Sequence, residues 1–162
     1  MHAEIESYLE DKVRDAAQRA FAAWNSAACV SVPLAGILAS FAATKPGFPQ
    51  QIGTKPFVQT RVGNIFAQFE AKIRANNGIR TEDVLGLLLP VGFEDGKIDQ
   101  VWLATTDGFG SARGDAAHQT GLHSRVKYAI DPQSDCNTVE QILQGLERVD
   151  DELTRLVDAI KK

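Results

Sequence analysis

The sequence predicts an all-α domain, a bundle of five or six helices, and three observations lead to that prediction. Apolar residues recur at intervals of three and four along several long stretches, which is the spacing of one helical face. Clusters of glycine, proline and asparagine separate these stretches. Only residues 125–130 alternate between apolar and polar, so the bundle contains at most one short extended segment.

Six stretches are predicted to be helices: residues 3–24, 33–43, 60–76, 81–89, 98–118 and 138–160. Acidic side chains crowd the first turns of the first helix, where they favour the positive end of the helix dipole. Pro33 suits the first turn of the second helix, because the N–H that proline lacks would be unpaired there. Three of the six prolines then predict a loop over residues 45–56.

Capping residues predict where the later helices begin and end. The third helix is expected to end at Asn77-Gly78 with a left-handed glycine. Thr81 is expected to cap the fourth helix, and Pro90 to end it. The last helix is expected to begin at Thr138, where Thr-x-x-Gln forms a capping box, and it carries the most regular apolar stripe of the chain.

Length and composition restrict the class of protein. A chain of 162 residues is long enough for a single domain over residues 1–162 with its own core. Its 44% hydrophobic and 23% charged residues are ordinary for a soluble globular protein. The net charge of −4 argues against a general coat for nucleic acids, which would be basic. Between residues 111 and 128, however, basic side chains outnumber acidic ones, so one short segment is locally positive.

The chain is predicted to act in the cytoplasm. Cys29 and Cys136 form neither a disulfide framework nor a metal-ligand spacing, which favours free thiols in a reducing compartment. The N-terminal residues lack a signal-peptide pattern. Residues 25–44 carry no charge, but they contain Pro33 and Gly36 and are rich in alanine. They therefore predict a buried helix and no membrane span.

The second half of the predicted helix over residues 98–118 has a distinct composition. From Gly108 onward most side chains are small, although each glycine costs a helix about 1 kcal/mol relative to alanine. Close approach by another helix or a ligand would explain such a surface. Arg113, Asp115 and His118 are set into it. Arginine binds phosphate through a fixed fork of donors and histidine titrates near neutrality, so the pattern indicates a site for a phosphodiester.

Other interpretations of these side chains stay open. In one of them Arg113 is an ordinary surface residue, and His118 donates a hydrogen bond to the last carbonyls of its helix. Asp115 either orients the His118 imidazole across an i,i+3 pair or only solvates the helix. His118 and His123 lack a third metal ligand nearby, so neither a metal nor another cofactor is expected.

The spacing Arg113-x4-His118 resembles the signature of the HEPN superfamily, small helical domains in which R-x4-6-H near the end of a helix marks a ribonuclease site. An apolar helix precedes the motif and Ala-His ends it, which is similar to the RiboL-PSP-type branch. The likeness is strongest over residues 82–121, and residues 5–13 also resemble the first helices of related branches.

The resemblance implies a metal-independent endoribonuclease that leaves 2′,3′-cyclic phosphate ends and acts as a toxin or phage-defence effector, often beside an antitoxin protein. A helix places Arg113 and His118 about 140° apart around its axis, and the family solves this by forming a homodimer whose two motifs share one groove. The predicted site residues fall into three groups: Arg113, Asp115 and His118 as catalytic; Ser111, His123, Arg125 and Lys127 as RNA-binding; and Gly108, Gly110, Gly114 and Ala117 as the dimer interface.

The motif departs from the family at one position. Its members place a polar residue, often Asn or Asp, directly after the arginine, whereas this chain has Gly114 there and carries the acid at Asp115. The alternative is therefore a catalytically silent HEPN domain that binds RNA or a protein partner as a helical dimer. A metal or cofactor enzyme built on a helical bundle is a third and more distant alternative.

Overall fold

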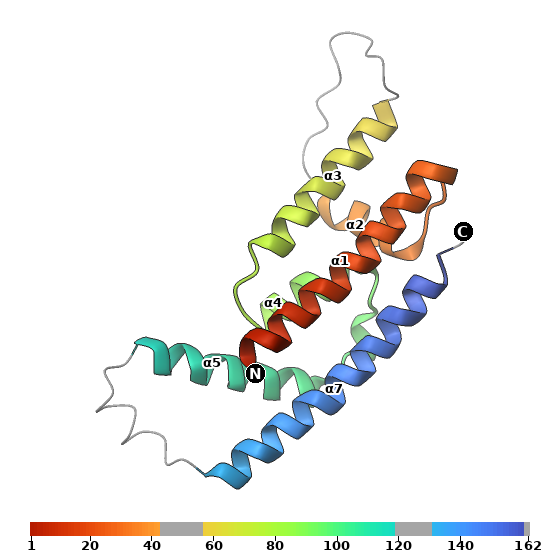
Figure 1. The fold of residues 1–162 in the computed structure, drawn as a ribbon. Helices are drawn as coiled ribbons and strands as arrows, with labels where there is room; N and C mark the ends of the chain where they lie inside the picture. The colour runs from red at the N-terminus through yellow and green to blue at the C-terminus, as the bar shows by residue number, and fades with distance from the viewer. Residues whose placement is uncertain (43–56, 119–130, 161–162) are drawn as a thin grey trace.

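The computed structural model describes residues 1–42, 57–118 and 131–160, and the side chains of 113–118 are not part of that description. Within these ranges the chain forms six α-helices, two single-turn 3₁₀ helices and no strand (Figure 1), which confirms the predicted all-α bundle. The elements are α1 (His2–Ala27), α2 (Val32–Phe41), α3 (Phe57–Arg74), α4 (Thr81–Leu88), η1 (Leu89–Val91), η2 (Asp95–Lys97), α5 (Gln100–His118) and α7 (Pro132–Asp158). Two predicted features lie outside the described residues: the loop over 45–56 and the extended segment over 125–130.

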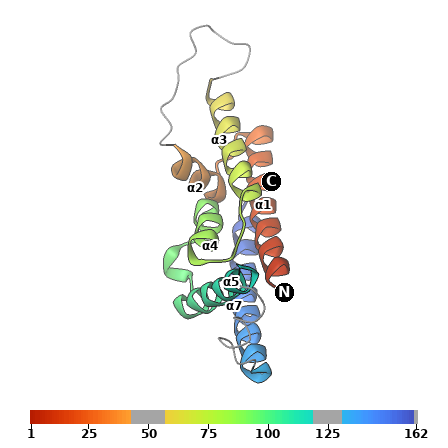
Figure 2. The same ribbon diagram turned by 90° about the vertical axis from the view of Figure 1, so that its left-hand side faces the viewer.

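The long helices α1, α3 and α7 form the body of the bundle (Figure 1). α1 and α7 run side by side in the same direction, and Lys12 pairs with Asp150 between them at 2.6 Å. α3 runs the opposite way, so that Asn76, just after its end, donates to Glu10 near the start of α1 at 3.0 Å. α5 crosses the lower part of α7, and α2 and α4 lie beside α1 and α3 (Figure 2).

One apolar cluster joins these helices. Each helix contributes side chains that repeat at intervals of three and four residues, so the predicted stripes do face the core. The main contributors are Ile5, Leu9 and Val13 from α1, Phe69 and Ile73 from α3, Leu87 and Leu88 from α4, Trp102 and Leu103 from α5, and Ile142, Val149 and Leu153 from α7.

Trp102 holds α5 on α7. Its indole lies against Gly145, where a side chain would occupy the same space, and its Nε1 donates to the carbonyl of Ile142 at 3.0 Å. Asp99 accepts hydrogen bonds from N–H groups in the first turn of α5 and also pairs with Arg148 of α7 at 2.9 Å. The start of α5 is therefore anchored at both a buried and a charged contact.

The predicted start of the last helix is wrong. α7 begins at Pro132 and not at Thr138. The side chain of Asp131 caps it by accepting from the N–H groups of Gln133 and Ser134, at 3.2 and 3.3 Å. An aspartate followed by proline is itself a strong start signal, since the cap satisfies free donors and proline needs none. Thr138 lies inside the helix, where its hydroxyl donates to the carbonyl of Ser134 at 2.9 Å.

The junction between α3 and α4 also differs from the prediction. Gly78 is not left-handed; among the described glycines only Gly92 has a positive φ, at 84°. Gly78 is needed for space instead, because a Cβ atom there would lie 2.6 Å from the carboxylate of Asp83. The N-cap of α4 is Arg80 and not Thr81, and the backbone N–H of Arg80 donates to Asp83 at 3.2 Å.

α1 and α2 meet at a sharp bend. α1 continues three residues past the predicted Trp24 to Ala27, and Ala28 ends it in a left-handed conformation with φ at 51°. No described helix taken singly combines the length and the hydropathy that a membrane crossing requires. α1 and α2 would meet those criteria only as a pair, by length and composition alone, and they are bent by 101° at their junction.

A surface ion-pair cluster connects η2 to α7. Glu152, whose side chain is 15% exposed, accepts from Arg155 at 2.6 Å and from Lys97 at 2.9 Å. The hydrogen bond from Arg155 is the largest influence, and together these cations lower the pKa of Glu152 from its ordinary value of 4.5 to about 2. Because the folded-state pKa is depressed, the stabilisation is complete above about pH 4.5 and is lost as pH falls toward 2.

We therefore expect Glu152→Gln to lower the free energy of unfolding at pH 7 by about 1 kcal/mol or less, because solvent screens ion pairs whose cations are exposed. The deficit relative to the wild type should shrink as the pH falls below about 4.5. Urea denaturation between pH 3 and 7 measures it, with Glu147→Gln on the exposed side of α7 as the control. A deficit that stays constant over this range would contradict the assignment of the low pKa to Glu152.

Candidate functional site

The C-terminal part of α5 carries the predicted motif. The helix is continuous from Gln100 to His118, so Arg113, Asp115 and His118 lie on one uninterrupted helix. The backbone of α5 is described as far as His118, and its side chains as far as Ala112. The last turns of α5 extend past the start of α1 and away from α7 (Figure 1).

The helical register separates the motif residues. Thr106 is fully buried and marks the side of α5 that faces the body of the bundle. At 100° per residue, positions Arg113 and Ala117 lie within about 20° of Thr106, position Asp115 lies opposite, and position His118 lies about 120° away. Arg113 and His118 are thus about 140° apart around the axis and about 7.5 Å apart along it. One copy of α5 therefore does not direct both positions toward a single phosphate.

One side of α5 contacts the start of α4. Asp107 accepts from the backbone N–H of Thr81 at 2.8 Å, and this hydrogen bond is the main reason that the pKa of Asp107 lies below its ordinary value. Three residues further on, Gly110 is buried against the segment before α4. A Cβ atom at Gly110 would lie 3.3 Å from Ile79 and 3.7 Å from Arg80. Gly110 thus allows the two segments to lie close together.

The start of α1 contacts another side of α5. The imidazole of His2 stacks on the ring of Phe109, with 6.3 Å between centroids and 23° between planes. Its Nδ1 lies 3.6 Å from a carboxylate oxygen of Glu6, and the two side chains are only 9% and 18% exposed. Position Arg113 follows Phe109 by one helical turn on the same side. A largely buried histidine and carboxylate therefore lie one turn from the motif.

The four small residues predicted as a dimer interface do not share one face of α5. Gly108 is exposed with no atom within 4 Å of a Cβ position, whereas Gly110 is covered by residues of its own chain. Around the axis, Gly108 and Gly110 are about 160° apart, and Gly114 and Ala117 lie nearer to Gly110. Packing within one chain explains why position 110 is a glycine, so a second copy is not needed to explain it.

The predicted RNA-binding residues are described only in part. Ser111 is half-buried on α5, on the same side as Asp107. His123, Arg125 and Lys127 lie outside the described residues, and so does most of the positive segment that suggested an anionic ligand.

Sequence reasoning missed three residues that the fold brings to α5. Arg80 reaches it from the segment before α4, and His2 reaches it from the start of α1, with Glu6 beside His2. Arg80 is 30 positions from Gly110 and His2 is more than 100 positions from Phe109, so no local spacing connects them to the motif. Only covariation between these positions and α5 in related sequences would provide such a signal.

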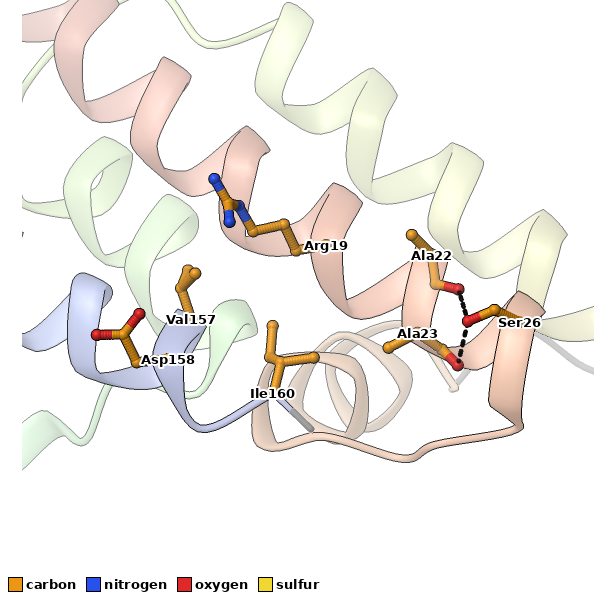
Figure 3. A pocket seen from close by; sticks show the side chains of 7 residues that line it. All are labelled: Arg19, Ala22, Ala23, Ser26, Val157, Asp158 and Ile160. Carbon is orange, nitrogen blue, oxygen red and sulfur yellow. Dashed lines mark hydrogen bonds between the residues drawn. The ribbon is translucent and has the colours of Figure 1, made fainter. Parts of the chain in front are cut away.

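A groove of about 440 Å³ lies between α1 and the end of α7, far from α5 (Figure 3). Its lining residues are Arg19, Ala22, Ala23, Ser26, Val157, Asp158 and Ile160. Most of its polar groups are bonded within the chain: Arg19 donates to Asp15 at 2.9 Å, and the Ser26 hydroxyl donates to the carbonyl of Ala22 at 2.9 Å. The groove contains no arrangement of acid, base and nucleophile.

The described side chains include no group of three or more His, Cys, Asp or Glu residues able to hold a metal ion. Comparison of the chain with family models, with curated proteins and with solved structures finds no match. The chemistry of the candidate site therefore has to be argued from α5 and its neighbours. These provide positions for a guanidinium and an imidazole on a helix end, with a second arginine beside that helix.

Proposed function

We propose that this chain is a metal-independent endoribonuclease of the HEPN type. The observation that carries the proposal is that α5 continues without a break through Arg113 and His118, so the R-x4-H spacing lies near the end of a helix that extends past the bundle. That is the setting in which the family resemblance predicts an active motif. The buried anchor of α5 at Trp102 supports it further, because a fixed helix can present its end in one orientation.

In the proposed reaction His118 takes the proton from the 2′-hydroxyl of the nucleotide before the cleaved bond. The 2′-oxygen then attacks the phosphorus, the bond to the 5′-oxygen breaks, and a proton is delivered to that leaving oxygen. Arg113 holds the phosphate and stabilises the charge that develops on it. The products are a 2′,3′-cyclic phosphate and a 5′-hydroxyl.

The proposal includes a homodimer. Because positions Arg113 and His118 point about 140° apart on one helix, a phosphate is held and attacked more readily by groups from two copies of α5. A role as a toxin or phage-defence effector acting beside an antitoxin follows from the resemblance, and action in the cytoplasm follows from the free cysteines; both belong to the same proposal.

A second candidate function is a silent domain that binds RNA or a protein partner without cutting. Gly114, directly after Arg113, favours it, because the family's usual polar side chain is missing at that place.

The decisive experiment incubates the purified chain with single-stranded and structured RNA, with and without EDTA. We expect cleavage that EDTA leaves unchanged, with new ends that carry 2′,3′-cyclic phosphate and 5′-hydroxyl groups. Sedimentation of the same preparation should give a dimer at micromolar concentration. Binding of RNA without cleavage would favour the silent domain, and cleavage that EDTA abolishes would contradict the proposed chemistry.

A further inference from the structure

Arg80 is an exposed cation directly before α4, where the start of that helix contacts α5. It is the N-cap residue of α4, and the aliphatic part of its side chain passes Gly110 of α5, at 3.7 Å from a Cβ position to Cγ. The missing side chain at Gly110 lets the arginine lie close against α5. Contact along the stem of the side chain, with the head in water, is the usual arrangement of an arginine on an apolar surface.

The acidic groups around Arg80 are bonded to backbone. Asp83 accepts from the N–H of Arg80 itself at 3.2 Å, and Asp107 accepts from the N–H of Thr81 at 2.8 Å. Both carboxylates still attract the guanidinium, and Glu82 is exposed nearby, but no ion pair within 4 Å joins Arg80 to a carboxylate of the described residues. The start of α4 is therefore closed to an anion by its own acids, whereas Arg80 as a residue is exposed.

α5 links Arg80 to the predicted motif. Position His118 lies within about 20° of Asp107 around the axis, so it is on the side of α5 that α4 contacts. Along the axis it lies about 12 Å beyond Gly110. The residues of α5 between them on that side, Ser111 and Gly114, are small.

We infer that Arg80 binds a backbone phosphate of the RNA beside the one that is cleaved, and so extends the site along α5 toward α4. The inference rests on the proposed function and adds a binding residue to it. Arginine suits this role because its planar fork of donors matches phosphate oxygens. Arg80 contacts α5 at Gly110, about 12 Å along the axis from position His118, so we expect it to contribute to affinity and not to the proton transfers at His118.

The test measures binding of a fluorescent, single-stranded 2′-O-methyl RNA, which lacks the attacking hydroxyl and so stays whole with the intact chain. Arg80→Gln keeps the stem against Gly110 and removes the charge, and Arg80→Lys restores the charge. Arg19→Gln is the matched control, because it removes one exposed positive charge on α1, away from α5. Affinity is recorded from low to high salt for each protein.

We expect Arg80→Gln to weaken binding several-fold at low salt and to make the dependence of log Kd on log salt shallower by about 0.7, the value for one lost phosphate contact on a single strand. Arg80→Lys should recover most of the slope, and Arg19→Gln should match the wild type. In cleavage assays Arg80→Gln should raise KM and leave kcat nearly unchanged.

An unchanged slope in Arg80→Gln, or the same loss in Arg19→Gln, would overturn the inference while leaving the ribonuclease proposal in place. If the wild type binds no RNA, both are overturned. If it binds RNA without cutting and Arg80→Gln still lowers the slope, the inference holds and the silent domain replaces the ribonuclease.

Discussion

Replacement of His118 by alanine is expected to lower the rate of RNA cleavage about 10²–10⁴-fold, because acid–base catalysis contributes a factor of that order. Arg113→Ala is expected to lower it by a similar factor through loss of charge stabilisation on the phosphate. Both variants should remain folded, since the two positions lie in the last turns of α5, beyond its buried anchor at Trp102. Initial rates on a defined RNA substrate give the ratio, and thermal melting of the same samples checks the fold.

The two variants can also test whether the site is shared between copies. A dimer of either variant alone has no site in which both His118 and Arg113 are intact. Mixed dimers of His118→Ala and Arg113→Ala contain one site with both groups intact, if each site combines His118 of one copy with Arg113 of the other. Equal mixing with exchange should therefore restore about a quarter of wild-type activity, since half of the dimers are mixed and each has one intact site of two. Failure to recover activity would contradict a site built in this way. Unchanged cleavage by His118→Ala alone would show that His118 takes no part in the mechanism.

Substitution of Gly145 is expected to destabilise the whole bundle. A Cβ atom at Gly145 would overlap the indole of Trp102, which is only 4% exposed and whose Nε1 donates to Ile142. The ring has to move, so Gly145→Ala loses this hydrogen bond as well as close packing. Overpacking and a lost buried bond together cost about 2–4 kcal/mol. For a chain of this size we expect the melting temperature to fall by roughly 5–15 °C.

Gly108→Ala is the matched control for Gly145→Ala. Both glycines lie inside helices, but a Cβ atom at Gly108 meets no atom within 4 Å. Alanine there should raise stability by about 0.5–1 kcal/mol, because it favours the helix and restricts the unfolded chain. Trp102→Leu should relieve the overlap, so the double variant with Gly145→Ala should be more stable than the sum of the two single effects. A stable Gly145→Ala with an unchanged Trp102 fluorescence spectrum would contradict this packing.

Local sequence determined most of the fold, because helical periodicity and breaker residues act over a few positions. The apolar stripes of α1, α3 and α7 predicted the core, and Trp102 of α5 lies there too, whereas Val101 beside it is 74% exposed. The same spacing predicted that the helix would reach His118, and α5 does so. Helix ends were less certain when two start signals competed. α7 begins at Asp131-Pro132 and not at the capping box of Thr138. The residues between the two signals are compatible with a helix, so the earlier cap makes the helix longer.

Only the tertiary structure decided what surrounds α5. Gly110 looked like part of an open surface for a second copy, but in the fold it makes room for Ile79 and Arg80. His2 stacks on Phe109 although more than 100 positions separate them in the chain. Such contacts depend on how whole helices pack, and no spacing within one helix encodes them. The sequence by itself therefore determined the helices and the R-x4-H spacing on α5. Packing determined which other charged groups lie beside that motif, because residues that meet across a core are selected by three-dimensional fit.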